Sequence, residues 1–597
     1  MKFINDLRDI VGEESFGRLF FVLFMTLLYA VIETFSVALI IPVLAIITNN
    51  ENLLIVKGFL NSNISSIHFS TSSIQIIIVI SFGFIFILKN IINVFLKYKI
   101  GIDIQQMRHR SQCKLFDSYL YMDYIKHTQI NSSELRRNID EIGTVFQGYI
   151  MSIFKLSSEF FVIVGIFTIL LFNNPLIAVS LFVSLSMFTF LIHTYFRVKL
   201  KEIGKKKLLY VEGLNRHFYQ GLSGIRDIKV SSTEKHFTSF YSHFMYKFLG
   251  TMRKSEIYSV MSTTLIESIV VVILLGLALL LLLTSDSSAS AFSQLVLFTV
   301  ALVRALSSVK IVSTSFQSIS FGSESVNLVS SEFRKVSLYK NNVSKNSSHI
   351  LTSPMQKNLT LEKVSFQYPD APGYSLSNIN LKIKSGSSVG IVGSSGSGKS
   401  TLIDILMNLI TPESGSYHID DYQVKHNDRL SDIIGYVSQS IYLLDDSIVN
   451  NIAFGVSEDE IDFKRIEKAL ELSALKTFVE TLPNGVNTIL GENGVRMSGG
   501  QKQRIGIARA LYNDVKILIF DEATSSLDPS TENSINESIS KLSNDRTIII
   551  ISHRMSSVAN CEKIIFMQNG LIEDSGTFES LKKNNLSFRE MANIQAK

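Results

Sequence analysis

The run Gly393-Ser-Ser-Gly-Ser-Gly-Lys399-Ser400-Thr401 has the spacing of a loop that binds the phosphates of a nucleotide. It fits the pattern G-x-x-x-x-G-K-[ST], and it lies between a strand-like segment, 388–392, and a helix-like segment, 402–409. Glycines let backbone N–H groups turn onto phosphate oxygens, and the start of a helix favours negative charge there. We therefore expect these nine residues to contact phosphate: Gly393, Ser394, Ser395, Gly396, Ser397, Gly398, Lys399, Ser400 and Thr401.

Two adjacent carboxylates follow a second apolar segment, Ile517–Phe520. The carboxyl end of a buried strand is where an α/β sheet places a site. Asp521 suits Mg²⁺, directly or through water, and Glu522 suits a general base for an attacking water. Lys399 is expected at the β- and γ-phosphates and Ser400 on the magnesium ion, so the cofactors predicted for this site are ATP and Mg²⁺.

Further segments resemble the motifs of ATP-binding-cassette (ABC) proteins, in the order of that family, over about 358–590. The segment Met-Ser-Gly-Gly-Gln at 497–501 resembles the family signature, with Met497 in place of the usual Leu, a swap between residues of similar volume. The resemblance implies that Tyr368 stacks on adenine, that Asp528 belongs to the D-loop, and that His553 is the switch histidine near the γ-phosphate. Gln439 resembles the glutamine that senses magnesium and the membrane domain. The implied catalytic set is Glu522, His553 and Gln439, and the implied metal set is Ser400, Gln439 and Asp521.

The same resemblance predicts a homodimer. Two cassettes of this family are thought to enclose ATP between the phosphate loop of one and the signature of the other. The chain contains one cassette and one six-span half, so a second copy is required to complete each of two equivalent sites. The signature residues expected to contact nucleotide are Ser498, Gly499, Gly500 and Gln501.

The first ~325 residues contain long apolar runs, whereas the rest has the composition of a mixed α/β protein. A helix that crosses a bilayer needs about 20 apolar residues. Six segments meet that length, and a Ser-, Asn- and Lys-rich stretch follows them. The predicted fold is therefore a six-helix transmembrane exporter domain (1–325), a linker (326–357) and an α/β P-loop ABC ATPase domain (358–597). The six expected spans are 19–48, 72–97, 146–172, 176–196, 256–283 and 288–320.

Lysine and arginine determine the expected orientation, because cytoplasmic loops carry an excess of both. They are frequent in 98–145 and 197–255, whereas 49–71 contains only Lys57. This predicts a multi-pass membrane protein with the ATPase domain and both termini in the cytoplasm. Residues 49–71 suit an external amphipathic helix or a plain loop. Two distant cysteines, Cys113 and Cys561, exclude a disulfide framework or a cysteine metal cluster.

Charged residues inside the expected spans point to a substrate cavity. Arginine at the centre of a span costs about 2.5–3.5 kcal/mol on insertion scales, so it normally faces a cavity and has a function. Arg304, Lys310 and Lys89 would give that cavity a basic lining suited to an anionic headgroup such as phosphate or pyrophosphate. The alternative is that Arg304 pairs with Glu33 or Glu267 inside the bundle.

A six-span domain ahead of the cassette resembles the arrangement of ABC exporters, and Thr488–Gly494 resembles the exporter X-loop. Segments 32–44, 131–139 and 224–229 are similar to PglK-type flippases for lipid-linked oligosaccharides. This resemblance implies a homodimer of the bacterial inner membrane that moves an amphipathic, anionic polyprenyl-pyrophosphate-linked oligosaccharide outward, with membrane lipids as partners and no nucleic acid. An exporter of lipid A, peptide or hydrophobic drug is the alternative among transporters. An ATP-gated regulator or channel is the alternative from another class, although such proteins tend to have a degenerate ATP site.

Overall fold

The structure is a computed structural model, and it describes residues 2–39, 71–284, 288–345, 355–369, 371–426, 428–523 and 546–595. The chain divides into two units. The first comprises Met1–Met122 and Lys126–Lys340, and the second comprises Asp123–Ile125 and Asn341–Lys597. Asp528 of the expected D-loop lies outside the described residues, as does the segment 49–71 except for its last residue.

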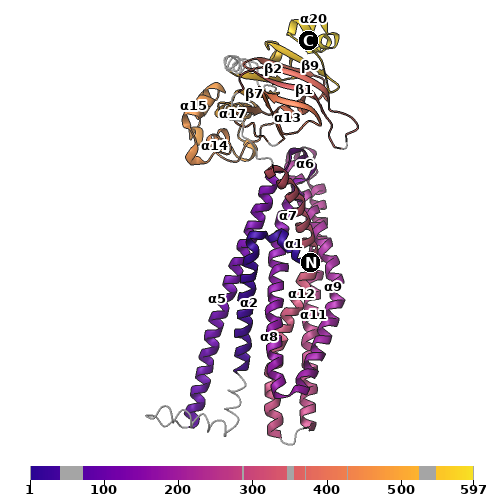
Figure 1. Ribbon diagram of the computed structural model, residues 1–597, viewed down its shortest axis with the longest axis vertical. Helices are drawn as coiled ribbons and strands as arrows, with labels where there is room; N and C mark the ends of the chain where they lie inside the picture. Colours follow the sequence, from indigo (N-terminus) through magenta and orange to yellow (C-terminus); the bar gives the residue numbers. More distant parts are fainter. Residues whose placement is uncertain are drawn as a thin grey trace. The chain divides into compact units, whose positions relative to one another are not determined.

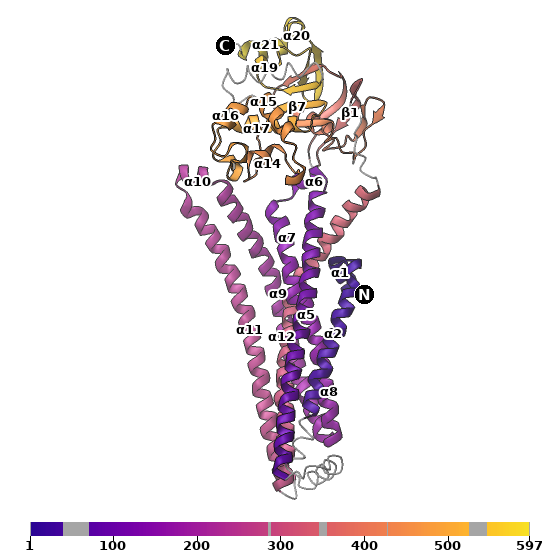
Figure 2. The ribbon, with the colours of Figure 1, turned by 90° about the vertical axis from the view of Figure 1, so that its left-hand side faces the viewer.

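The first unit is helical (Figures 1 and 2). Six of its helices are long and apolar enough to cross a membrane by length and composition. The predicted fold class, six such helices followed by an α/β ATPase domain, is therefore confirmed. The helices are α1 (Lys2–Val11), α2 (Glu13–Ala38), α5 (Thr71–Leu120), α6 (Tyr124–Gln129), α7 (Ser132–Thr144), the π-helix η1 (Val145–Ile150), α8 (Met151–Asn173), α9 (Pro175–Ser223), α10 (Ile225–Ser231), α11 (Glu234–Thr284) and α12 (Ser288–Lys345).

Several helices continue well beyond a bilayer. The 50 residues of α5 span about 75 Å at 1.5 Å per residue, against a hydrocarbon core of about 30 Å. Between α8 and α9 the chain turns at Asn174, whose side chain accepts a hydrogen bond from the Ile177 N–H and caps α9 ahead of its first residue, Pro175. The last helix runs to Lys345, so residues 326–345 of the expected linker are helical.

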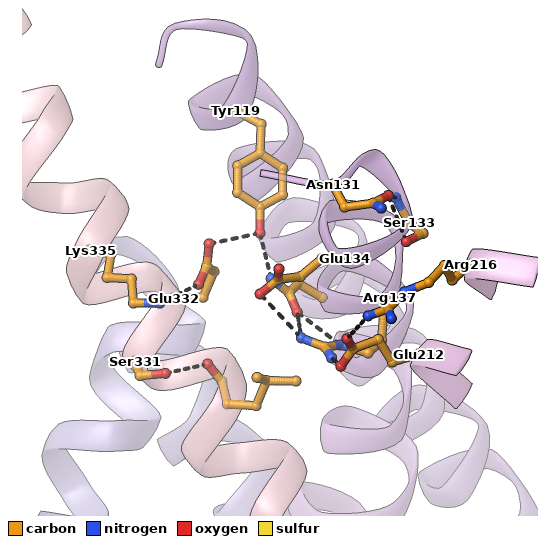
Figure 3. A network of polar contacts seen from close by, with 12 residues as sticks. Tyr119, Asn131, Ser133, Glu134, Arg137, Glu212, Arg216, Ser331, Glu332 and Lys335 are labelled. Atoms are coloured by element: carbon orange, nitrogen blue, oxygen red, sulfur yellow. Dashed lines mark hydrogen bonds and ion pairs between the residues drawn. The ribbon is translucent and has the colours of Figure 1, made fainter. Parts of the chain in front are cut away.

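Polar contacts connect the short helix α7 with the long helices α5, α9 and α12 (Figure 3). The Tyr119 hydroxyl donates to Glu332 Oε1 at 3.2 Å, which joins α5 to α12. Arg137 of α7 pairs with Glu212 of α9. The Asn138 side chain of α7 donates to the Tyr119 hydroxyl at 3.2 Å, so one connected set of polar contacts joins the four helices.

A close backbone approach between α9 and α12 requires a glycine at position 204. A Cβ atom there would lie 2.1 Å from the backbone oxygen of Phe321. Gly204→Ala is therefore expected to destabilise the first unit by about 1–3 kcal/mol, because the helices must move apart. The melting temperature of the purified chain in detergent measures this. Gly221→Ala in the same helix, where no atom lies within 4 Å, is the control and should leave stability unchanged or raise it.

The second unit contains two sheets. A four-stranded sheet has the order β2-β1-β4-β5, and a six-stranded sheet has the order β10-β9-β3-β8-β7-β6. Strands β9, β3, β8, β7 and β6 are parallel, and β10 is antiparallel to β9. The strands are β1 (Asn358–Phe366), β2 (Leu376–Lys384), β3 (Ser388–Gly393), β4 (Ser414–Ile419), β5 (Tyr422–Gln423), β6 (Ile434–Val437), β7 (Ile517–Asp521), β8 (Thr547–Ile551), β9 (Lys563–Gln568) and β10 (Leu571–Gly576).

Helices cover the six-stranded sheet, whose central strands are almost continuously apolar because both faces are buried. One core contains Leu402 and Ile405 of α13 against Ile391 and Ile519 of the sheet. The helices of this unit are α13 (Lys399–Leu406), α14 (Ile448–Ile452), α15 (Phe463–Leu472), α16 (Lys476–Glu480), α17 (Gly499–Tyr512), α19 (Met555–Val558), α20 (Phe578–Asn584) and α21 (Leu586–Gln595).

Candidate nucleotide-binding site

Four neighbouring parallel strands, in the order β3-β8-β7-β6, bring the predicted site residues to one edge of the sheet. The phosphate loop follows β3, His553 follows β8, Glu522 follows β7, and Gln439 follows β6. Parallel strands end at the same edge, so segments separated by up to about 160 residues in sequence meet there.

Glycine is required in the phosphate loop by backbone geometry. Gly396 and Gly398 have φ values of +77° and +97°, in the left-handed region that side chains disfavour. A Cβ atom on Gly393 would lie 2.2 Å from the backbone oxygen of Met567. The loop therefore holds a fixed shape, and its last glycine is followed directly by α13 at Lys399.

The loop presents donors suited to phosphate. The Lys399 Nζ atom donates to the backbone oxygens of Gly393 and Ser394, at 3.0 Å and 2.8 Å, so the ammonium lies within the curve of the loop. Burial lowers the pKa of Lys399, while Glu522 and Asp521 act in the opposite direction. The Ser397 hydroxyl oxygen is buried and has no hydrogen-bond partner among the described residues.

The two carboxylates after β7 have separate partners. Glu522 accepts a hydrogen bond from Gln439 Nε2 at 2.7 Å, and its other oxygen lies 3.0 Å from His553 Nε2. Its backbone has a φ of 49°, a strained conformation for a residue with a side chain, and its N–H donates to the Ile551 oxygen at 2.9 Å. The glutamate is thus held between two neighbours on a backbone whose position the sheet fixes.

Asp521 has a partner that the sequence analysis missed. The Tyr436 hydroxyl, on the adjacent strand β6, donates to Asp521 Oδ2 at 3.1 Å. Burial raises the pKa of Asp521, whereas the hydrogen bond from Tyr436 lowers it. A tyrosine within an apolar strand pattern carries no motif, and only the pairing of β6 with β7 reveals this contact.

We predict that Tyr436→Phe weakens the use of magnesium. Removing one hydrogen bond to a charged group costs about 1.5–3 kcal/mol, so the Mg²⁺ concentration at half-maximal ATP hydrolysis should rise by about tenfold or more. The maximal rate at saturating Mg²⁺ should change less, because the Asp521 carboxylate remains. Tyr442→Phe, at an exposed tyrosine outside the cavity, is the control. An unchanged magnesium dependence would remove Tyr436 from the site.

The phosphate loop, Gln439, His553 and the two carboxylates after β7 surround one cavity of about 820 Å³. The volume and the charge pattern suit a nucleoside triphosphate with its metal: a loop of N–H groups and a lysine face two carboxylates. The predicted residues that line the cavity are Ser395, Gly396, Gly398, Lys399, Ser400, Thr401, Gln439, Asp521, Glu522 and His553.

Some predicted residues lie elsewhere. Tyr368 does not line the cavity: its ring packs edge-on against Phe366 with centroids 5.0 Å apart, and its hydroxyl oxygen lies 3.5 Å from Thr401 Oγ1. Tyr374, which is 58% exposed, lines the cavity instead. Gly393, Ser394 and Ser397 belong to the loop but do not line the cavity.

The signature residues form the start of α17. The Ser498 hydroxyl accepts from the Gln501 N–H, and the Gln501 side chain accepts from the Ser498 N–H, which makes a capping box. None of Ser498, Gly499, Gly500 and Gln501 lines the cavity of the same chain.

The charged residues of the first unit that were expected to line a substrate cavity are paired with acids. Arg304 lies 3.2 Å from Glu33 and 3.9 Å from Glu159. Lys89 lies 3.1 Å from Glu33, and Lys310 lies 2.7 Å from Glu267. The alternative pairing of Arg304 with Glu33 is the one that the structure contains.

Comparison with known proteins supports the reading of the second unit. Residues 376–525 match the sequence model of the family described as ABC transporter. An ATP-dependent lipid A-core flippase of Idiomarina loihiensis is 35% identical over 313 residues, which cover 52% of this chain and 52% of that protein. One from Cupriavidus pinatubonensis is 38% identical over 241 residues, covering 40% of this chain and 41% of the flippase. The alpha-hemolysin translocation ATP-binding protein HlyB of Escherichia coli O157:H7 is 42% identical over 246 residues, covering 40% of this chain and 35% of HlyB.

These matches span about half or less of the relatives' own length. A comparison of whole structures extends further. The structure of a bacterial Atm1-family ABC exporter with ATP bound aligns with a TM-score of 0.78, covering 98% of this chain and 99% of the exporter chain at 21% identity. The arrangement of six long helices followed by an ATPase domain is thus the fold of an ABC exporter.

Proposed function

We propose that this chain is one half of a homodimeric ABC exporter that uses ATP hydrolysis to move an amphipathic lipid across a bacterial inner membrane. The observation that carries the proposal is the convergence of the phosphate loop, Glu522, His553 and Gln439 on one cavity. A chain with six helices able to cross a membrane, and with these groups at one cavity, has both parts that such an activity needs. The intact set also favours hydrolysis over an ATP-gated channel or regulator.

The proposed chemistry assigns a role to each side chain. Glu522 accepts the proton of the attacking water, and Gln439 and His553 hold its carboxylate in place. Lys399 and the loop N–H groups bind the phosphates and stabilise the charge that develops on them. Ser400, Gln439 and Asp521 would hold Mg²⁺, which supplies further neutralisation of phosphate charge.

A second copy is proposed because the signature is missing from the cavity of its own chain. Ser498 begins a 14-residue helix, and the N–H groups that follow it favour a bound phosphate. In the dimer, this helix start would face the γ-phosphate held by the partner's loop. The arrangement makes each site depend on both chains.

The lipid substrate is supported by two considerations. Relatives that share 35–38% identity with part of this chain are named lipid A-core flippases. The segments similar to PglK-type flippases favour a polyprenyl-pyrophosphate-linked oligosaccharide instead. Both are amphipathic lipids whose headgroups carry phosphate and sugar, and we propose a substrate of that class. Export of a polypeptide is the second candidate, because HlyB is 42% identical over 246 residues.

Reconstitution into liposomes tests the proposal. Liposomes containing the chain receive fluorescent lipid A, a fluorescent polyprenyl-pyrophosphate glycan or a labelled polypeptide, and ATP-dependent translocation is measured. We expect one of the two lipids to move and movement to stop in a Glu522→Gln chain. Movement of the polypeptide alone would overturn the lipid assignment, and ATP hydrolysis without any movement would overturn export.

A further inference from the structure

A second cavity lies within the helical unit, between α2, α5, α8 and α12. Its volume is about 340 Å³, within the range of small-ligand sites. One part of the lining is apolar and includes Ile100, Phe154 and Ile311. Another part carries two lysines, Lys97 and Lys155. The cavity is therefore amphipathic, and none of the three basic residues expected from the sequence to line a substrate cavity lies in it.

The charges near this cavity do not cancel. Glu159 is the acid in the lining, and Arg304 lies 3.9 Å from it. Arg304 also pairs with Glu33, which pairs with Lys89. This four-residue cluster, with two acids and two bases, is neutral in itself.

Lys97 and Lys155 lie outside that cluster. Neither has an acidic side chain within 4.0 Å among the residues that the structure describes, and Lys97 instead lies 4.9 Å from the centre of the Tyr29 ring. Both lysines are exposed in the single chain, and they line the cavity without an acid at ion-pair distance among the described residues. A site in an apolar helical unit with two uncompensated lysines favours a ligand with about two negative charges, such as a phosphate monoester or a pyrophosphate.

Polar groups in the lining suit the rest of such a headgroup. Ser315 and Ser318 donate no hydrogen bond among the described residues, so both hydroxyls are available to phosphate oxygens. The Glu159 side chain is 4% exposed, and its Oε2 atom has no hydrogen-bond partner in the described part of the chain. That oxygen is enclosed by protein and faces the Arg304 guanidinium at 3.9 Å, so the acid of the lining is already paired and the two lysines are the charges left for a ligand.

The position of the cavity along the spans favours a lipid over a free anion. Lys97 is the last residue of the apolar run 72–97. Lysine and arginine become frequent directly after it, so this end of the run is expected to face the cytoplasm. That is the depth of the headgroups of the inner leaflet. The apolar part of the lining would contact acyl or prenyl chains. It would not stabilise a hydrated inorganic ion, which has no apolar surface to bury.

We propose that this cavity binds the phosphate-bearing headgroup of a lipid from the inner leaflet, with Lys97 and Lys155 on the phosphate. This proposal rests on the proposed function only in that the bound lipid would be the one that the exporter moves outward. Binding itself requires no ATP.

Equilibrium binding to the full chain in detergent tests this. The probes are dioctanoyl phosphatidic acid, which carries a phosphate monoester, dioctanoyl phosphatidylcholine, whose headgroup is neutral overall, and inorganic phosphate. We expect phosphatidic acid to bind at least about tenfold more tightly than the other two probes. The double variant Lys97→Gln/Lys155→Gln should lose about tenfold or more of that affinity, because each lysine makes a charge-assisted contact.

Two further variants separate charge from folding. Lys99→Gln removes a charge from an exposed lysine on the same helix that does not line the cavity, and it should retain wild-type affinity. Lys97→Arg/Lys155→Arg keeps both charges and should retain most of the affinity. Unchanged binding by the double Gln variant would overturn the proposal, and so would equal affinity for phosphatidylcholine or for inorganic phosphate.

The outcome is separable from that of the proposed function. If the wild-type chain binds phosphatidic acid through the two lysines but moves no lipid in liposomes, the transport proposal fails and the site stands. If the chain moves lipid while the double Gln variant binds normally, only the site assignment fails.

Discussion

Replacing Glu522 with glutamine will reduce the rate of ATP hydrolysis by about 10²–10⁴-fold, the contribution typical of a general base. Glutamine has nearly the same shape, so the contacts that position the side chain can largely re-form. What the variant lacks is a group that accepts the proton of the attacking water. Nucleotide binding should be retained, because the phosphate loop and Lys399 are untouched, and ATP should therefore remain bound without turnover.

Phosphate release measures the rate, and a fluorescent ATP analogue measures binding. Glu562→Gln is the matched control, because Glu562 is an exposed glutamate of the same unit that does not line the cavity. We expect its hydrolysis to equal that of the wild type. Undiminished hydrolysis by the Glu522 variant would show that another group, or no side chain at all, accepts the proton.

The strain at Glu522 adds a second reason for a large effect. A residue with a side chain held at a φ of 49° carries an energetic cost of about 1–3 kcal/mol, which persists only where the surrounding structure over-determines it. Here the strand β7 and the contacts from Gln439 and His553 fix it. Because this backbone is fixed, the Glu522 side chain has one position. The site therefore cannot rearrange to compensate for the loss of the carboxylate.

The nucleotide site could largely be predicted from the sequence because its parts are local motifs. The phosphate loop needs glycines at fixed positions, and a strand that ends in two acids is recognisable by itself. Their meeting at one cavity then follows from parallel strands ending at one edge. Tyr436 could not be predicted, since its role depends on which strand lies beside β7.

The helical unit was predictable in kind but not in its contacts. Apolar length reveals spans, and Lys and Arg frequencies give an expected orientation, but neither shows which way a charged side chain points. The sequence favoured Arg304 and Lys89 as cavity residues, whereas in the structure both pair with Glu33. Neither Lys97 nor Lys155 was among the residues that the sequence placed in a substrate cavity. The structure shows that Glu33 and Glu159 pair with Arg304 and Lys89, and this leaves Lys97 and Lys155 without an acidic partner among the described residues.

Replacing Arg304 with glutamine is expected to destabilise the helical unit by about 3–5 kcal/mol, the cost of removing one partner from a buried charge pair. Arg304 is 19% exposed and contacts Glu33 and Glu159, which are 13% and 4% exposed. Without the guanidinium, Glu33 keeps Lys89 as its partner, whereas Glu159 has no cation within 4.0 Å among the described residues. If Arg304 lined a substrate cavity, as the sequence also allowed, its loss would be expected to affect transport rather than stability.

A second substitution should restore much of the loss. In Arg304→Gln/Glu159→Gln, the Lys89–Glu33 pair at 3.1 Å remains and the cluster is again neutral. We therefore expect the double variant to be more stable than Arg304→Gln alone, the sign of direct coupling between the two residues. Unfolding of the full chain in mixed detergent micelles, followed by the helical circular dichroism signal, measures each free energy.

Arg136→Gln is the control for the loss of an arginine. Its partner Asp140 lies 2.9 Å away, but the two side chains are 61% and 51% exposed, so the cost should be below about 1 kcal/mol. A different pattern, with Arg304→Gln as stable as the wild type and unable to move lipid, would mean that Arg304 acts on the substrate. In that case Arg304 would not be committed to Glu33 and Glu159, and it could bind the headgroup itself. The assignment of the headgroup to Lys97 and Lys155 alone would then be wrong.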